Sequence, residues 1–222
     1  MSVRLVSVRV GRVQRMPRPE WDQHTERQWS SAYVKDEVSG AIGVGVLGLD
    51  GDEHFDRASH GGPDKAVLAY GADHYPAWRT ELGIAEFGPG AFGENLCVTG
   101  LDETTVSIGD RWMIGSVTLE VSQPRGPCAN ISRRWNREDL MARVTRSRRT
   151  GWYLRVVRAG RLSAGDAVIR RPGPHVEWTV ERVFNLYTRQ IEDPVAIAAL
   201  TALPVLSARW REEFARRATP RR

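Results

Sequence analysis

Closely spaced strand and turn signals constrain the fold of this chain more than any other feature. From Phe92 to Val121, apolar and polar residues alternate with period two, and the alternation is broken at "TGLDE", "IGD" and "IGS". The glycines and aspartates at these breaks supply the backbone angles that tight turns need. Strands this close in sequence favour an antiparallel meander or a barrel. We therefore predict a mainly β fold with a barrel as its largest part.

Further strands and helices are predicted on both sides of this region. Residues 3–10 alternate in the same way, and "KAVLAY" (65–70) is an apolar run of strand length. "GWYLRVVRAGRLSAGDAVIR" (151–170) gives two more strands around its glycine turns. Helical spacing of apolar residues predicts one short helix within residues 73–82 and another through "REDLMARV" (137–144). The chain should therefore be α+β, with short helices among its strands.

The segment "RRPGPH" (170–175) interrupts every periodic pattern with two prolines and a glycine. We place a domain boundary here, with a barrel domain over residues 1–171 and a small helical domain over residues 172–222. Three helices are predicted in the second domain, where Asp193 followed by Pro194 is a helix start signal. Because this domain has few large apolar groups, it should pack on the barrel or on a second copy of the chain, which leaves a homodimer open.

Charge and composition exclude some classes of function. The net charge of +5 comes from arginine clusters and could indicate nucleic-acid binding. However, no nucleic-acid-binding motif accompanies these clusters, so we rank that function last. The N-terminus lacks the continuous apolar stretch of a signal peptide or a membrane span, so we expect a cytoplasmic protein with no membrane partner. The two cysteines are too few for a disulfide framework and lack zinc-finger spacing.

The two cysteines differ in their sequence surroundings. Cys97 lies in "NLCVTG" on an alternating strand and fits a small apolar core residue. Cys128 ends the motif "QPRGPC", whose prolines remove hydrogen-bond donors from a strand, so its thiol is expected on a loop at a strand end. The nearby Arg125 would favour the thiolate, which is the form that attacks a substrate or binds a soft metal. A catalytic cysteine and histidine pair, with His60 as the base, stays open.

Two glycine-containing segments concentrate polar side chains before strands. For "GLDGDEHFDRASHGGPDKAV" (48–67), spacing alone favours a surface loop, because no set of side chains matches a metal geometry. Its "HGG" allows another interpretation, in which the backbone approaches a ligand while His60 and Lys65 meet an anion. "PGAFGENL" (89–96) brackets Glu94 and Asn95 with glycines, and a binding loop competes there with a β-bulge.

Several of these motifs resemble those of one family, the MOSC-domain proteins of the YiiM type. The shared motifs, in chain order, are "GLDGDEHFDRASHGGPDKAVLAY", "HYPAW", "PGAFGENL", "GLDETTVSIGDRWMIG", "LEVSQPRGPC" and "GWYLRV". The resemblance runs from about Val3 to Arg171. The tail with "LTALPVLSARWREEFARR" is similar to the three-helix domain that follows the MOSC domain in that group. The motifs are long and specific.

The resemblance implies a MOSC β-barrel that binds the molybdenum cofactor, with Cys128 as the thiolate ligand of molybdenum. It also implies reduction of an N-hydroxylated base or amine, such as 6-N-hydroxylaminopurine, from N–OH to N–H. An external electron-donating reductase is then required as a partner, because the sequence has no flavin or iron-sulfur motif. The alternative is a carrier of sulfur or of the molybdenum cofactor that uses Cys128 without turnover. Descriptions of the family also mention pyridoxal phosphate, but we can nominate no Schiff-base lysine here.

The predicted site combines residues from several motifs. Cys128 is predicted as the metal ligand, with His60 and Asn95 as contacts to the substrate or to the groups around the metal. The candidate cofactor anchors are all cationic: Lys35, Lys65, Arg125 and Arg133. Asp64 could orient His60 or Lys65, and Glu94 could move a proton, although a turn role explains either carboxylate equally well.

Overall fold

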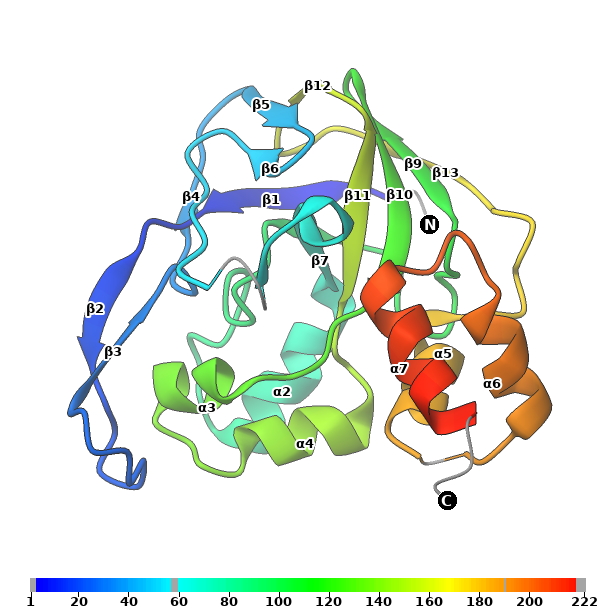
Figure 1. Ribbon diagram of the computed structural model, residues 1–222. Coiled ribbons are helices and arrows are strands. Elements are labelled where there is room, and N and C mark those ends of the chain that lie inside the picture. Colours follow the sequence, from blue (N-terminus) through cyan, green and yellow to red (C-terminus); the bar gives the residue numbers. More distant parts are fainter. Residues whose placement is uncertain (1–2, 57–59, 190, 219–222) are drawn as a thin grey trace.

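The computed structural model describes residues 3–56, 60–189 and 191–218. An eight-stranded sheet forms its body, in the order β13-β9-β10-β11-β7-β8-β1-β4. The strands of this sheet are β1 (Leu5–Val10), β4 (Asp36–Glu37), β7 (Val67–Gly71), β8 (Leu96–Val98), β9 (Arg111–Ile114), β10 (Val117–Pro124), β11 (Trp152–Arg158) and β13 (Val168–Arg171). The sheet curves back on itself, because Arg4 pairs with Ala167 and the Leu5 N–H donates to the Asp166 carbonyl at 3.0 Å. The predicted barrel-like, mainly β fold is confirmed (Figure 1).

The sheet is mixed, because it contains one parallel pair of strands that the sequence analysis did not predict. β7 and β8 are parallel, with Ala69 opposite Leu96. The chain passes from β7 through the 3-10 turn η2 (Ala72–His74) and the helix α2 (Tyr75–Leu82) before it reaches β8. Parallel neighbours require such a crossover, and a helix is its usual form.

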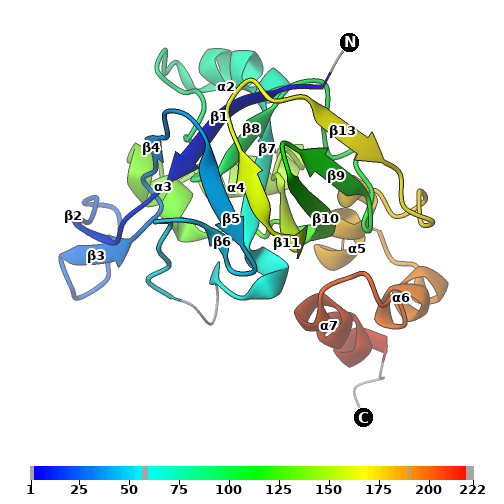
Figure 2. The same ribbon diagram turned by 90° about the horizontal axis from the view of Figure 1, so that it is seen from above.

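Two smaller sheets extend from this body. β12 (Gly160–Leu162), β5 (Ile42–Gly45) and β6 (Gly48–Leu49) form a three-stranded sheet. β2 (Gln14–Pro17) and β3 (Gln28–Ser31) form a hairpin that projects from the body (Figure 1). We call residues 14–31 the hairpin arm. The arm and the C-terminal helices lie on opposite sides of the molecule in both views (Figure 2).

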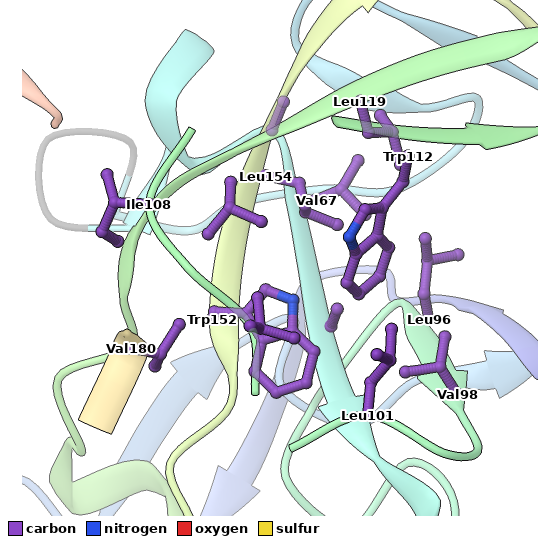
Figure 3. Close-up of a cluster of buried hydrophobic side chains, with 14 of the residues drawn as sticks. Val67, Leu96, Val98, Leu101, Ile108, Trp112, Leu119, Trp152, Leu154 and Val180 are labelled. Atoms are coloured by element: carbon purple, nitrogen blue, oxygen red, sulfur yellow. The ribbon is translucent and has the colours of Figure 1, made fainter. Parts of the chain in front are cut away.

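The main core fills the inside of the curved sheet. Trp112 on β9 and Trp152 on β11 are fully buried and meet edge to face, with their ring centroids 5.7 Å apart (Figure 3). Such a pair adds to the stability that the burial of two large rings supplies. Val180, from the first C-terminal helix, lies in the same cluster. The helical tail and the barrel therefore share one apolar interior.

Helices cover two sides of the sheet. α2, α3 (Ala129–Trp135) and α4 (Leu140–Ser147) contribute to a second, aromatic-rich core around Trp78. α5 (Val180–Tyr187), α6 (Pro194–Thr201) and α7 (Ala208–Ala218) form the tail. The start signal predicted for α6 is confirmed, because the Asp193 carboxylate accepts from the Ala196 N–H at 3.0 Å. The boundary predicted after residue 171 falls at the end of β13 and stays a prediction. None of the described helices combines the length and apolar character needed to cross a bilayer.

Candidate functional site

A cavity of about 520 Å³ lies beside the hairpin arm and collects most of the predicted site residues. Its walls come from the arm, the chain after it, the loop before β7, the start of β8 and the segment after β10. Seven of the nine predicted residues line it: Lys35, His60, Lys65, Asn95, Arg125, Cys128 and Arg133. The structure therefore brings together the predicted thiol, one imidazole and all four candidate anchors.

Cys128 lies where β10 has ended and α3 begins, as the residue that precedes the first helical position. The prediction of a loop at the strand end missed α3, which starts directly after the thiol. Burial alone would raise the pKa of Cys128. The hydrogen bond from His60, the Arg125 charge and the backbone N–H of Asn130 outweigh burial and lower the pKa from 9.0 to about 7. A large fraction of Cys128 is therefore thiolate at neutral pH.

The ionisation of Cys128 can be tested without any cofactor. We expect the rate of its alkylation by iodoacetamide to rise with pH around a midpoint near 7, because only the thiolate attacks. His60→Gln should shift this midpoint upward, since it removes the hydrogen bond that stabilises the thiolate. Cys97 is the internal control, because it is fully buried and burial raises its pKa. A Cys128 midpoint that stays near 9 in the wild-type chain would contradict this interpretation.

Arg125 is a buried cation in the cavity wall, with only 3% of its surface exposed. Its charge opposes the effect of burial on the pKa of Tyr33 and of Tyr153, and its Cζ lies 5.9 Å from the centre of the Tyr33 ring. Burial raises the pKa of Tyr153 to about 12, so this phenol stays protonated at neutral pH. Arg125 Nη1 is buried and has no hydrogen-bond partner among the described residues. An unpaired buried donor is costly, and an anion in the cavity would satisfy it.

Asn95 and Lys35 belong to one buried network whose centre is Asp52. The Asp52 carboxylate accepts from the Gly11 N–H at 2.7 Å, from Asn95 Nδ2 at 2.9 Å and from the Lys35 ammonium. Asn95 Nδ2 also donates to the Arg9 carbonyl at 3.1 Å, and its Oδ1 accepts from the Leu68 N–H at 3.0 Å.

Both donor hydrogens of the Asn95 amide are therefore engaged within the protein. This placement favours a positioning role for Asn95 over direct substrate contact. Burial lowers the pKa of Lys35, and the neighbouring Asp52 opposes that shift.

Lys65 lies on the 3-10 turn η1 (Pro63–Lys65), beside the entrance of β7. Burial and the charge of Arg209 on α7 lower its pKa to about 8, against the opposing effects of Asp56 and Asp64. The ammonium therefore remains largely charged at neutral pH. Its position in the cavity wall fits the predicted role of an anion contact.

Asp64 is not among the cavity-lining residues and connects the barrel to the helical tail. Its Oδ1 lies 2.8 Å from Arg155 Nη2, and its Oδ2 accepts from the Ala208 N–H at 3.4 Å. Arg155 Nη1 also donates to Glu120 and to the Val205 carbonyl, both at 2.9 Å. These contacts give Asp64 a structural role, and its charge opposes the lowering of the pKa of Lys65 in the cavity wall.

Glu94 also lies outside the cavity lining. It is fully buried, and its carboxylate accepts from the Tyr75 hydroxyl and from the N–H groups of Gly90 and Phe92. Burial raises the pKa of this carboxyl. Of the two roles predicted for Glu94, these contacts favour the structural one, which shapes the loop before β8.

Sequence reasoning missed several residues that shape the cavity. Tyr33, Asp52 and Trp29 all lie upstream of most of the quoted motifs, and each gains its role from contacts with distant segments. The arm is fastened to α3, because Trp21 Nε1 donates to Asn136 Oδ1 at 3.0 Å. One sequence signal could have indicated this part of the cavity wall. Apolar and polar residues alternate over residues 28–33, which predicts a strand with one buried face.

The fold and the cavity define a class of protein. Residues 56–169 match the model of the MOSC domain, and this chain belongs to that family. Residues 178–217 match the model of the YiiM-like 3-alpha helix domain, so within the family the chain is of the YiiM type. The arm and the segment up to residue 55 lie outside both matches, although they form part of the cavity wall.

Relatives of known sequence support this assignment. Protein YiiM from Escherichia coli is 33% identical over 189 residues, which cover 84% of each chain. The uncharacterized protein YflK from Bacillus subtilis is 30% identical over 197 residues and 89% of each chain. A protein from Gibberella moniliformis named Reductase is 35% identical over 179 residues, which cover 79% of this chain and 32% of that protein. The chain therefore spans about a third of the length of this last relative.

Solved structures show the same architecture. YiiM from Geobacillus stearothermophilus superimposes with a TM-score of 0.81 and 27% identity, over 98% of this chain and 100% of that one. YiiM from Escherichia coli gives a TM-score of 0.71 and 28% identity, over 82% of this chain and 87% of that one. The confirmed YiiM-type fold therefore includes both the barrel and the helical tail.

Proposed function

We propose that this chain binds the molybdenum cofactor and reduces N-hydroxylated compounds such as 6-N-hydroxylaminopurine, with Cys128 as the protein ligand of molybdenum. The observation that carries the proposal is a single thiol with a pKa of about 7 in the wall of a cation-lined cavity. A thiolate suits a soft metal that arrives with its other ligands. The unsatisfied Nη1 of buried Arg125 provides a donor for an anionic group of the same ligand. The residues present therefore fit this cofactor.

In this proposal, the residues of the cavity wall have distinct roles in binding the cofactor. Arg125, Lys35 and Lys65 would hold the cofactor phosphate, since all three place positive charge in the cavity wall. His60 keeps Cys128 in its thiolate form through their hydrogen bond. Asp52 and Asn95 fix the direction of Lys35. When bound, the cofactor supplies a metal centre that accepts and donates two electrons.

The overall reaction also sets requirements outside this chain. Reduction of R–NH–OH to R–NH2 releases water and consumes two electrons and two protons. The electrons are proposed to come from an external reductase partner. The protons can enter from solvent, with His60 on the cavity wall as the side chain best placed to pass one on. The name Reductase of the Gibberella moniliformis relative supports a reductive activity for this barrel.

The proposal is tested by turnover. The purified, cofactor-loaded chain with a reduced viologen dye as the electron donor should convert 6-N-hydroxylaminopurine to adenine, measured by chromatography. The same chain without cofactor should leave the substrate unchanged. A loaded chain that consumes no substrate, yet transfers its cofactor to an acceptor apoenzyme, would support the alternative of a carrier. The accessible, low-pKa thiol of Cys128 is the feature that keeps this alternative, including a persulfide carrier, in consideration.

A further inference from the structure

The cavity contains a second pair of cations on the side of the hairpin arm. Arg18 on the arm and Arg133 on α3 both line the cavity, and their guanidinium groups meet on one carboxylate, that of Asp22. Arg18 Nη1 and Arg133 Nε each lie 2.7 Å from Asp22 Oδ2. The two arginine side chains are 8% and 22% exposed. Two positive charges thus share one negative charge in a largely enclosed place.

The contacts of this pair leave Nη2 of each guanidinium available. Arg18 Nε donates to the Gln28 carbonyl at 3.2 Å, and Arg133 Nη1 donates to Asn130 Oδ1 at 3.1 Å. Within the described part of the chain, Nη2 of neither arginine makes a hydrogen bond. A guanidinium that is held at Nε and at Nη1 presents its Nη2 donors in a set direction, which suits the oxygens of a phosphate. Asp22 is therefore a positioning residue for both arginines.

An aromatic ring lies next to this pair. Trp29 lines the cavity, and its ring centre is 5.9 Å from Arg133 Cζ. The indole Nε1 donates to the Pro17 carbonyl at 3.2 Å, which fixes the ring. On the loop before β7, Phe55 also lines the cavity and is 63% exposed. Trp29 is 5% exposed, so Phe55 presents most of the open ring surface, and a planar heteroaromatic base packs well on such a ring. A phosphate joined to that base would share the cavity with the two arginines.

We propose that the substrate is a phosphorylated N-hydroxylated compound of the nucleotide class, whose phosphate is bound by Arg18 and Arg133. The chemistry at the base rests on the proposed function, whereas binding of the phosphate does not require it. The group that Arg18 and Arg133 would recognise is a phosphate monoester, and both a nucleotide and the molybdenum cofactor carry one. The experiments below separate these two sources.

Titration calorimetry with AMP and with adenosine tests the phosphate contact on the full chain without cofactor. AMP should bind more tightly than adenosine by on the order of tenfold to a hundredfold, because hydrogen bonds between charged groups are strong. Arg18→Gln and Arg133→Gln should each remove most of this ratio while the affinity for adenosine stays unchanged. Arg143→Gln is the matched control, because it breaks an exposed arginine ion pair on α4, with Asp139, and Arg143 does not line the cavity.

The affinity for adenosine also reports whether the arm has detached. A variant that loses adenosine and AMP equally has lost the wall. Arg18→Lys and Arg133→Lys, which keep the charge, are then used: each should keep the affinity for adenosine and lower the AMP-to-adenosine ratio, because lysine lacks the fixed, forked donors of arginine. For the positioning role, Asp22→Asn should lower the ratio and Asp22→Glu should restore it. The proposal is overturned by an unchanged ratio of AMP affinity to adenosine affinity in both glutamine variants, or in both lysine variants together with Asp22→Asn. It is also overturned if the wild-type chain binds AMP no more tightly than adenosine.

The pterin content of the purified chain distinguishes the cofactor from a nucleotide as the source of the bound phosphate. Arg133 here binds the substrate, in place of its predicted role as a cofactor anchor, and the cofactor phosphate is left to Arg125, Lys35 and Lys65. Arg18→Gln and Arg133→Gln, purified from a host that makes the cofactor, should therefore retain wild-type amounts of oxidised-pterin fluorescence. A loss of pterin in both would assign the pair to the cofactor and overturn the nucleotide assignment. If only the proposed function is wrong, AMP still binds more tightly than adenosine, but the loaded chain does not reduce 6-N-hydroxylaminopurine. If only this inference is wrong, the loaded chain reduces 6-N-hydroxylaminopurine, but AMP binds no more tightly than adenosine.

Discussion

Cys128→Ser is expected to reduce the molybdenum content of the purified chain to background and to abolish reduction of 6-N-hydroxylaminopurine. A serine hydroxyl stays protonated at neutral pH and is a poor ligand for a soft metal, whereas Cys128 ionises near pH 7. The fold should remain intact, because Cys128 precedes α3 and makes no side-chain cap bond to it. Elemental analysis for molybdenum, circular dichroism and a turnover assay measure the three outcomes.

The second cysteine provides the control for this experiment. Cys97 is fully buried between its neighbours on β8, and burial raises its pKa, so its thiol is not available to a ligand. Cys97→Ala should cost some stability through lost packing, yet keep the molybdenum content and the turnover per folded chain. Wild-type molybdenum content in Cys128→Ser would refute the ligand role of Cys128.

Asp52→Ala is expected to lower the free energy of unfolding by about 3–5 kcal/mol, which is typical of removing one partner from a buried ion pair. The Asp52 and Lys35 side chains are 1% and 7% exposed, so the largely buried ammonium of Lys35 would lose the carboxylate with which it pairs. The N–H of Gly11 and the amide of Asn95 would lose an acceptor as well. Urea unfolding followed by tryptophan fluorescence measures the loss.

A double variant identifies the cause of that loss. Asp52→Ala combined with Lys35→Met removes the uncompensated charge, so it should be more stable than Asp52→Ala alone. Asp139→Ala, which breaks the exposed pair with Arg143, should change stability little. Equal stability of the single and double Asp52 variants would show that the lost hydrogen bonds, and not the buried charge of Lys35, dominate.

Local sequence signals predicted the parts of the fold that depend on local physics. Turn glycines and strand alternation gave the barrel, and the carboxylate and proline of Asp193 and Pro194 gave the start of α6. The parallel pairing of β7 and β8 was missed although its signal was present. A strand, a helix and a second strand in succession are typical of a parallel crossover. The short helix α3 was missed because the residue at its N-cap, Cys128, makes no side-chain cap bond.

The site was predictable where a residue acts through neighbours in sequence. Arg125 lies three residues before Cys128, so its effect on the thiol could be read from the motif. The role of Asn95 could not, because its amide is occupied by groups on three separate segments. Tyr33 was missed for the same reason, since it reaches Arg125 only in the folded chain. Partners distant in sequence were thus the main source of error.

The origin of the cavity walls has a consequence for the order of events during biosynthesis. Asp22 and Arg133, which bind the arm to α3, are separated by 111 positions in the chain. Contacts of such long range form only after the intervening chain has been restricted, so they are established late in folding. The nascent polypeptide therefore has no complete cavity while the ribosome is still translating the middle of the message. Among the described residues, the last one that lines the cavity is Tyr153, so a large ligand can be enclosed only after the chain has been made at least that far.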